Sequence, residues 1–147
     1  MENQPNKSLS HAVYLLRLHI VFVTKYRRKV FTPAMLSYAR DVFANILSDW
    51  RCSLIEFGGE EDHVHLLVDI HPSLNLSTLI NNLKSASSRR IRNEYSEHIS
   101  RIYWKPLLWH RAYYVGSVGT VTPDTILRYV KNQGTKEKTQ KTTDLSA

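Results

Sequence analysis

The sequence contains a single cysteine, Cys52, among its 147 residues. One cysteine can form neither an internal disulfide bond nor a zinc site built from several thiolates. No apolar run approaches the ~20 residues that a membrane-spanning helix needs, and residues 1–10 lack the apolar centre of a signal peptide. These absences predict a cytoplasmic protein with no membrane partner. The place of Cys52 before the apolar Leu54 and Ile55 predicts that it is a small buried side chain.

Acidic residues are few relative to basic ones. The chain has 13 Asp and Glu against 20 Lys and Arg, which gives a formal net charge of +7. Because attraction to phosphate is long-ranged and independent of sequence, this balance favours a nucleic acid or another polyanion as partner. Many basic proteins bind no polyanion, so charge alone leaves the choice open.

Hydrophobic periodicity predicts an alternation of strands and helices. The first helix is expected from Thr32, an N-cap residue followed by Pro33 at the first helical position, to Trp50. Between the second and third strands, Gly58-Gly59 is expected to form the turn of a hairpin. The expected strands cover residues 14–24, 51–57, 62–70 and 112–118, and the other helices cover residues 76–99 and 123–133.

The order β-α-β-β-α-β-α predicts an α+β fold. We expect a ferredoxin-like (RRM-like) antiparallel sheet with helices on one face, plus a C-terminal helix that carries Tyr129. A single domain is expected over residues 1–133. Residues 1–12 at its start are predicted to be a flexible tail, and residues 134–147, which follow it, are predicted to be a second one.

The third expected strand carries two histidines, His63 and His65. Side chains alternate across a strand, so both histidines share one face with Leu67 and Asp69. The backbone spacing of ~6–7 Å lets both imidazoles bind one cation, but His-x-His is a short motif and two histidines leave a metal site incomplete. The other face is uniformly apolar and is expected to pack on the core; it consists of Val64, Leu66, Val68 and Ile70.

The last expected helix places Tyr129 and Gln133 four residues apart, and therefore on one face. A glutamine amide oxygen suits a hard cation such as Mg²⁺ or Mn²⁺ better than it suits zinc. A tyrosine hydroxyl can attack phosphorus and form a covalent phosphotyrosine, which conserves the energy of the cut bond. Tyr113 and Tyr114 are rival nucleophiles, but neither has a ligand-type residue one helical turn away.

In combination, these segments resemble the single-tyrosine HUH transposases, the TnpA-type enzymes of small insertion sequences. The similarity runs from about residue 17 to residue 133. Each matching segment is short, and the order and spacing of the segments make the resemblance specific. The segments are HIVF at 19–22, KYRRKV at 25–30, DHVHLL at 62–67, LKSASSR at 83–89, LW at 108–109 and YVKNQ at 129–133.

The resemblance implies that His63 and His65 are metal ligands, that Tyr129 is the nucleophile and that Gln133 is the third ligand. It implies a divalent metal, Mg²⁺ or Mn²⁺, and cleavage of single-stranded DNA at hairpin-bearing element ends through a 5′-phosphotyrosine and a free 3′-OH. It also implies a homodimer in which the tyrosine helix can complete the partner's site. Ser85 stands where the family usually has glycine, and we expect little effect because serine is small.

Several basic side chains are candidates for DNA binding. Arg27, Arg28 and Lys29 cluster in one turn and are predicted to contact the backbone of a DNA hairpin. On the long helix, Lys84 lies at the edge of the buried stripe and is predicted to meet a phosphate near the active site. Arg89 points away from the core, where it either contacts DNA or belongs to a solvated face.

Aromatic residues between the long helix and the last strand are candidates for stacking on bases. At least one tryptophan among them is expected to be buried instead. The candidates are Tyr103, Trp104 and Trp109.

Three other functions remain open from the sequence. A non-catalytic nucleic-acid-binding domain has the same sheet, but RNA-recognition modules carry aromatic residues rather than histidines on the exposed face of the central strands. A related HUH nuclease of replication initiation or plasmid transfer is disfavoured by the small size of the chain. An inactive copy of a transposase has the same sequence features.

Overall fold

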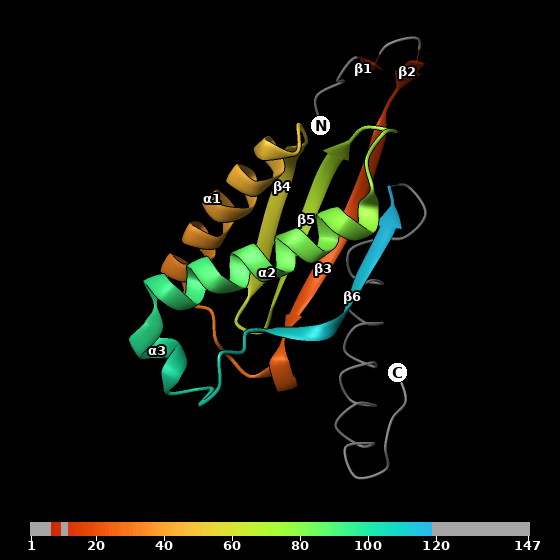
Figure 1. Cartoon of the computed structure of the whole chain (residues 1–147). Coiled ribbons are helices and arrows are strands. Elements are labelled where there is room, and N and C mark those ends of the chain that lie inside the picture. Colours follow the sequence, from red (N-terminus) through yellow and green to blue (C-terminus); the bar gives the residue numbers. More distant parts are fainter. Residues whose placement is uncertain (1–6, 10–11, 119–147) are drawn as a thin grey trace, which may run out of the picture.

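The computed structural model describes residues 7–9 and 12–118, with side chains from residue 15 onward. The helix expected over residues 123–133 lies outside the described residues. The described elements are, in chain order, β1 (Lys7–Leu9), β2 (Ala12–Tyr14), β3 (Leu16–Thr24), the short 3-10 helix η1 (Lys25–Arg27), α1 (Pro33–Asp49), β4 (Ser53–Glu60), β5 (His63–Ile70), α2 (Leu76–Glu94), α3 (Ser96–Ser100) and β6 (Trp109–Ser117) (Figure 1).

The main sheet has four strands in the order β4-β5-β3-β6. The central strand β3 pairs antiparallel with β5 on one side and with β6 on the other, while β4 and β5 form an antiparallel hairpin. Figure 1 shows α1 and α2 crossing the same face of this sheet. The arrangement is α+β and ferredoxin-like, which is the fold class that the sequence predicts.

The hydrophobic core lies between the sheet and the two long helices. β5 contributes Val64, Leu66 and Val68, all with 0% exposure, which confirms its predicted apolar face. Cys52 is buried in the same core. The other large, fully buried side chains come mostly from β3, α1 and α2: Ile20, Phe22, Met35, Phe43, Leu47, Leu79, Ile80, Leu83, Ile91 and Leu108.

Both long helices begin with a side-chain cap. Thr32 accepts a hydrogen bond of 3.2 Å from the backbone N–H of Met35 and precedes Pro33, as predicted. Asn75 accepts one of 3.1 Å from Thr78 at the start of α2. Such caps satisfy N–H groups that have no partner within the helix. No helix in the described part of the chain is both long and apolar enough to cross a membrane.

The hairpin turn lies further along the chain than the sequence predicts. Gly58 and Gly59 are within β4, and the turn follows at residues 61–62. A Cβ atom at Gly58 would lie 2.5 Å from Nε2 of His65, and one at Gly59 would lie 2.6 Å from the backbone oxygen of His63. The close approach of the β5 backbone therefore requires glycine at position 59, and the imidazole of His65 occupies the space beside Gly58. The prediction that these two glycines form the turn is wrong.

Other element boundaries also differ from the prediction. The long helix ends at Glu94, since Tyr95 has φ −116° and ψ 39°, and the separate helix α3 follows. β6 begins at Trp109 rather than at residue 112, because Trp109 pairs with Thr24 of β3. β1 and β2 pair as a small antiparallel sheet that was not predicted and lies partly within residues 1–12.

Candidate functional site

The two histidines of β5 lie on the face of the sheet opposite the helices. His63 pairs with Glu60 of β4, and His65 stands two residues further along the same face. Their neighbours Val64 and Leu66 are fully buried on the core side, which confirms the predicted alternation. His63 itself is only 4% exposed, and His65 is half-buried.

His65 depends on a glycine in the neighbouring strand. Gly58 is its partner on β4, and the missing side chain leaves room for the imidazole in the position that it occupies. Burial lowers the pKa of His65, and the nearby His63 and His19 lower it further. An imidazole that is neutral at neutral pH keeps a nitrogen lone pair for a metal ion.

Asp62 connects His63 to Arg27 of η1, the short helix that follows β3. Its Oδ1 lies 2.8 Å from Nδ1 of His63, and its Oδ2 accepts a hydrogen bond of 2.8 Å from the guanidinium of Arg27. The hydrogen bond with His63 and the ion pair with Arg27 hold the pKa of Asp62 well below its usual range, although burial opposes them. The carboxylate is therefore ionised at neutral pH and acts only as an acceptor.

The turn that carries Arg27 has an uncommon backbone conformation. Tyr26 and Arg27 have φ of 58° and 51°, and the left-handed region costs a non-glycine residue roughly 1–2 kcal/mol. Thr24 ties this turn to the hairpin: its N–H donates to the carbonyl of Asp62 over 2.9 Å, and its hydroxyl donates to that of Arg28 over 2.7 Å. The surrounding structure thus maintains strained backbone beside the histidines, which is typical of functional sites.

A cluster of metal-ligand types lies at the same place. Glu60, Asp62 and His63 each offer one ligand atom, and these atoms lie within 4.8 Å of one another. Sequence reasoning missed Glu60 and Asp62, although an acidic run directly before the first histidine was a visible signal. Both oxygens of Asp62 already contact protein groups, which leaves the carboxylate of Glu60 beside the imidazoles of His63 and His65. An oxygen donor beside imidazoles suits Mg²⁺ or Mn²⁺, so these three side chains fit a hard divalent cation.

The three basic residues of the turn have different surroundings. Arg27 is committed to its ion pair and is 22% exposed. Arg28 is exposed, and its guanidinium donates to the carbonyl of Ile102. Lys29 is 81% exposed and lies 3.7 Å from the exposed Glu61, which makes a weak surface pair. The predicted hairpin contact is therefore compatible with Arg28 and Lys29, while Arg27 points to the histidine site.

Lys84 contacts β6. Its ammonium donates to the backbone carbonyls of His110 and Arg111 over 2.9 and 2.7 Å and lies 5.7 Å from the ring centre of Tyr113. Burial lowers the pKa of Lys84, and nearby positive charges lower it further. The ammonium is therefore held by two carbonyls of β6, and the phosphate contact predicted for Lys84 near the active site stays a prediction.

Arg89 lies on the exposed side of α2, as predicted. Together with Arg90, Arg92, Asn93 and Ser96 it lines an open hollow on the surface. Three guanidinium groups around one hollow favour an anionic partner. The DNA contact of Arg89 stays a prediction.

Of the three aromatic candidates for base stacking, only Trp104 is exposed. Trp109 is buried and donates from its indole to the hydroxyl of Ser87 over 2.9 Å. Tyr103 is also buried, and its hydroxyl donates to a backbone carbonyl. Trp104 is 87% exposed, with the ammonium of Lys105 at 4.9 Å from its ring centre. The predicted burial of at least one tryptophan is confirmed, and Trp104 remains a stacking candidate.

Tyr129 and Gln133 lie outside the described residues. Among the rival nucleophiles, Tyr114 stands on the histidine face, because it pairs with Val21, which in turn pairs with His65. Tyr114 is half-buried there. It is consequently the natural control for any test of Tyr129.

The sequence matches known transposases over most of its length. The profile of IS200-like transposases matches residues 12–133. The transposase of insertion sequence element IS200 from Salmonella typhimurium is 31% identical over 133 residues, which cover 90% of this chain and 86% of that protein. The ISDra2 transposase TnpA from Deinococcus radiodurans is 29% identical over 125 residues, which cover 85% of this chain and 89% of that protein.

Solved structures agree with this assignment. The crystal structure of a candidate transposase from Deinococcus radiodurans has a TM-score of 0.79 at 29% identity, and the match covers 86% of this chain and 97% of that one. A REP-associated tyrosine transposase bound to a REP hairpin has a TM-score of 0.50 at 11% identity, a likeness of fold alone; the match covers 92% of this chain and 77% of that one. Since the family profile spans most of the sequence and the fold agrees, this chain belongs to the IS200-like transposase family.

Proposed function

We propose that this transposase cuts and rejoins single-stranded DNA at the ends of its insertion sequence. Tyr129 is the nucleophile in this proposal, and His63, His65 and Gln133 hold one divalent cation, Mg²⁺ or Mn²⁺. The observation that carries the proposal is the pair of histidines on one face of β5, beside a carboxylate that contacts the first of them. Family membership supports it, because transposition requires DNA strands to be cut and joined.

The proposed reaction exchanges one phosphodiester bond for another. The hydroxyl oxygen of Tyr129 gives up its proton and attacks the scissile phosphorus, while the bond from phosphorus to the 3′-oxygen breaks. That oxygen takes up a proton and leaves as a free 3′-OH, and the 5′-phosphate stays on the tyrosine. Because the number of phosphodiester bonds is unchanged, a 3′-OH can reverse the step and join strands without an added nucleotide.

The histidine face would supply the surroundings for the divalent cation. When bound, such a cation offsets charge that develops on the scissile phosphate. His63 and His65 contribute nitrogen lone pairs, and Glu60 contributes an exposed carboxylate within the same cluster. Asp62 keeps both of its oxygens on protein partners and therefore acts through His63.

The proposed substrate is a DNA hairpin with adjacent unpaired nucleotides, bound by a homodimer in the cytoplasm. The structural neighbour that is bound to a REP hairpin supports a hairpin as partner. Arg28 and Lys29 beside the strained turn and Arg89 on α2 offer exposed positive charge to phosphates. Trp104 offers an exposed ring on which an unpaired base can stack.

A covalent-complex assay tests the proposal. Full-length protein is incubated with single-stranded oligonucleotides that tile both ends of its own element, in Mn²⁺ or in EDTA. The oligonucleotides are labelled at the 3′ end, because the 3′ part of a cut strand stays on the tyrosine. We expect a labelled protein band on a denaturing gel with Mn²⁺ and none with EDTA. Tyr129→Phe is expected to lose the band and to retain DNA binding.

Tyr114→Phe is the matched control. Tyr114 lies on the histidine face, and its substitution removes a phenolic hydroxyl just as Tyr129→Phe does. This control is expected to retain the band. A band that survives Tyr129→Phe and disappears in Tyr114→Phe or Tyr113→Phe would assign the nucleophile elsewhere. Binding of hairpin DNA by the wild type without cleavage at either element end would favour a non-catalytic DNA-binding protein.

A further inference from the structure

Asp62 lies between a predicted metal ligand, His63, and the strained turn that carries Arg27. One of its carboxylate oxygens contacts the imidazole, and the other accepts a hydrogen bond from the guanidinium. We propose that Asp62, held by Arg27, is a positioning residue that fixes the tautomer and direction of the His63 imidazole. This inference rests on the proposed function, in which His63 binds a divalent cation. It assigns a role to Asp62 and Arg27, which the sequence motif alone does not indicate.

The tautomer follows from the hydrogen bond. An ionised carboxylate only accepts, so Nδ1 of His63, which lies 2.8 Å from Oδ1 of Asp62, must carry the hydrogen. The lone pair of the neutral ring is then on Nε2, for which the described residues offer no hydrogen-bond partner. A carboxylate on the other ring nitrogen orients a metal-ligating histidine and raises its basicity.

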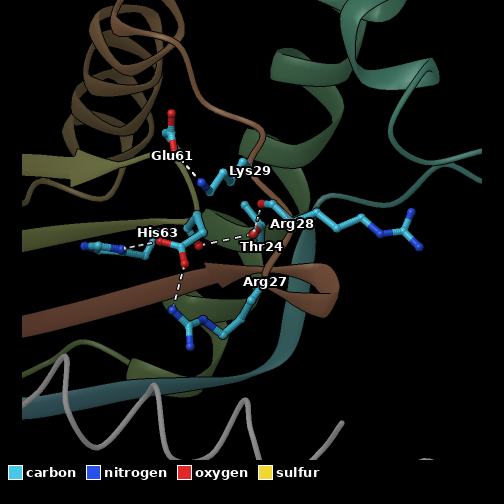
Figure 2. A network of polar contacts seen from close by, with 7 residues as sticks. Thr24, Arg27, Arg28, Lys29, Glu61 and His63 are labelled. Atoms are coloured by element: carbon cyan, nitrogen blue, oxygen red, sulfur yellow. Dashed lines mark hydrogen bonds and ion pairs between the residues drawn. The ribbon is translucent and has the colours of Figure 1, made fainter.

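Arg27 in turn orients the carboxylate of Asp62. Its guanidinium donates to Oδ2 over 2.8 Å, and the side chains of Arg27 and Asp62 are only 22% and 18% exposed. Figure 2 shows Arg27 and His63 at the two ends of this chain of contacts. The left-handed conformation of Tyr26 and Arg27 brings the turn to this place, and Thr24 ties its backbone to that of Asp62. The arrangement extends from β3 through the hairpin turn to the histidine.

An ordinary surface ion pair explains these observations less well. The neighbouring pair, Lys29 with Glu61, is 81% and 63% exposed and is separated by 3.7 Å. The Arg27–Asp62 pair is shorter, is partly buried and ends on a nearly buried imidazole. Two acidic residues adjacent in sequence thus have different surroundings, and Glu61 provides a control that removes the same charge one residue away.

The experiment compares Asp62→Ala and Asp62→Asn with Glu61→Ala in the full-length protein, after circular dichroism has confirmed folding. Binding of Mn²⁺ alone is measured by the loss of the free-ion EPR signal. The tautomer of His63 is read in the metal-free protein from its ring ¹⁵N chemical shifts, with His63→Gln for assignment. Asp62→Asn keeps the shape of the side chain and loses the obligatory acceptor, so it also serves if the alanine variant fails to fold.

We expect Asp62→Ala to weaken Mn²⁺ binding by about 10–100-fold and Glu61→Ala to change it by about twofold or less. The hydrogen of His63 is expected on Nδ1 in the wild type and in Glu61→Ala, and to move largely to Nε2 in Asp62→Ala. Equal Mn²⁺ affinity in the Asp62 and Glu61 variants, or an unchanged tautomer in both Asp62 variants, would overturn the inference. Failure of the wild type to bind Mn²⁺ would instead contradict the proposed function, while the tautomer measurement still decides the role of Asp62.

Discussion

The two faces of β5 use one strand in different ways. On the helix-covered face, Val64 and Leu66 are fully buried apolar side chains. On the other face, His63 and His65 present polar rings, the first of which contacts Asp62. The apolar face requires that side chains fill space without voids, whereas the polar face requires that each ring has a defined direction and partner.

The neighbouring strand repeats this contrast with two glycines. Gly59 pairs with Val64, and an added Cβ there would meet the backbone of β5 and the side chain of Leu36. Gly58 pairs with His65, and the three atoms nearest to an added Cβ there all belong to the imidazole. The same residue type therefore serves packing on one face and the position of a functional ring on the other. Variants on the two faces should separate stability from activity.

The largest expected difference is between Leu66→Ala and His65→Ala, adjacent positions on opposite faces. Leu66→Ala should lower the free energy of unfolding by about 2–5 kcal/mol, because it leaves a cavity in the core. His65→Ala should lower it by about 1 kcal/mol or less and should abolish the covalent DNA complex. Urea denaturation and the gel assay measure the two effects. A loss of stability in His65→Ala as large as in Leu66→Ala would contradict this division between the faces.

The two glycines provide a smaller and sharper comparison. Gly59→Ala is expected to cost about 1–3 kcal/mol of stability, since its new Cβ would lie 2.6 Å from a backbone oxygen. Gly58→Ala meets a ring that can rotate, so we expect a loss of about 1 kcal/mol or less. Because the rotated ring is misplaced, Mn²⁺ affinity should fall roughly tenfold in Gly58→Ala. Unchanged Mn²⁺ binding in that variant would show that the direction of His65 is not critical.

The smallest expected effect concerns Lys84, a DNA-binding candidate that lies on the helix-covered side. Lys84→Met should lower the free energy of unfolding by about 1 kcal/mol, because two carbonyls of β6 lose a donor. Its affinity for hairpin DNA should change by about twofold or less, since the ammonium is committed to protein. Arg89→Met, on the exposed side of α2, is the control.

For Arg89→Met we expect the reverse result: stability within about 0.5 kcal/mol of the wild type and weaker, less salt-dependent DNA binding. Titrations at two salt concentrations measure the DNA affinity of both variants. Weaker DNA binding by Lys84→Met at unchanged stability would contradict this expectation and would support the phosphate contact that the sequence predicts for Lys84.

Local patterns in the sequence were sufficient for the fold class and for part of the site. Alternation along β5 placed His63 and His65 on one face and Val64 on the other, because the side-chain period of a strand is a property of the backbone. The cap at Thr32 marked the start of α1 for the same local reason. These signals require no knowledge of which segments meet in space.

The tertiary structure decided the partners of those residues. Arg27 meets Asp62 across 35 positions of the chain, a contact that no local pattern in the sequence indicates. The sequence predicts a turn at Gly58, whereas the register of β4 and β5 places this glycine beside His65. Side-chain periodicity and secondary-structure propensity act within a few residues. Contacts between distant segments follow instead from strand register and packing, which arise only when the whole core assembles. The sequence by itself therefore determined which face of β5 carries the two histidines, and the folded structure determined what holds them there.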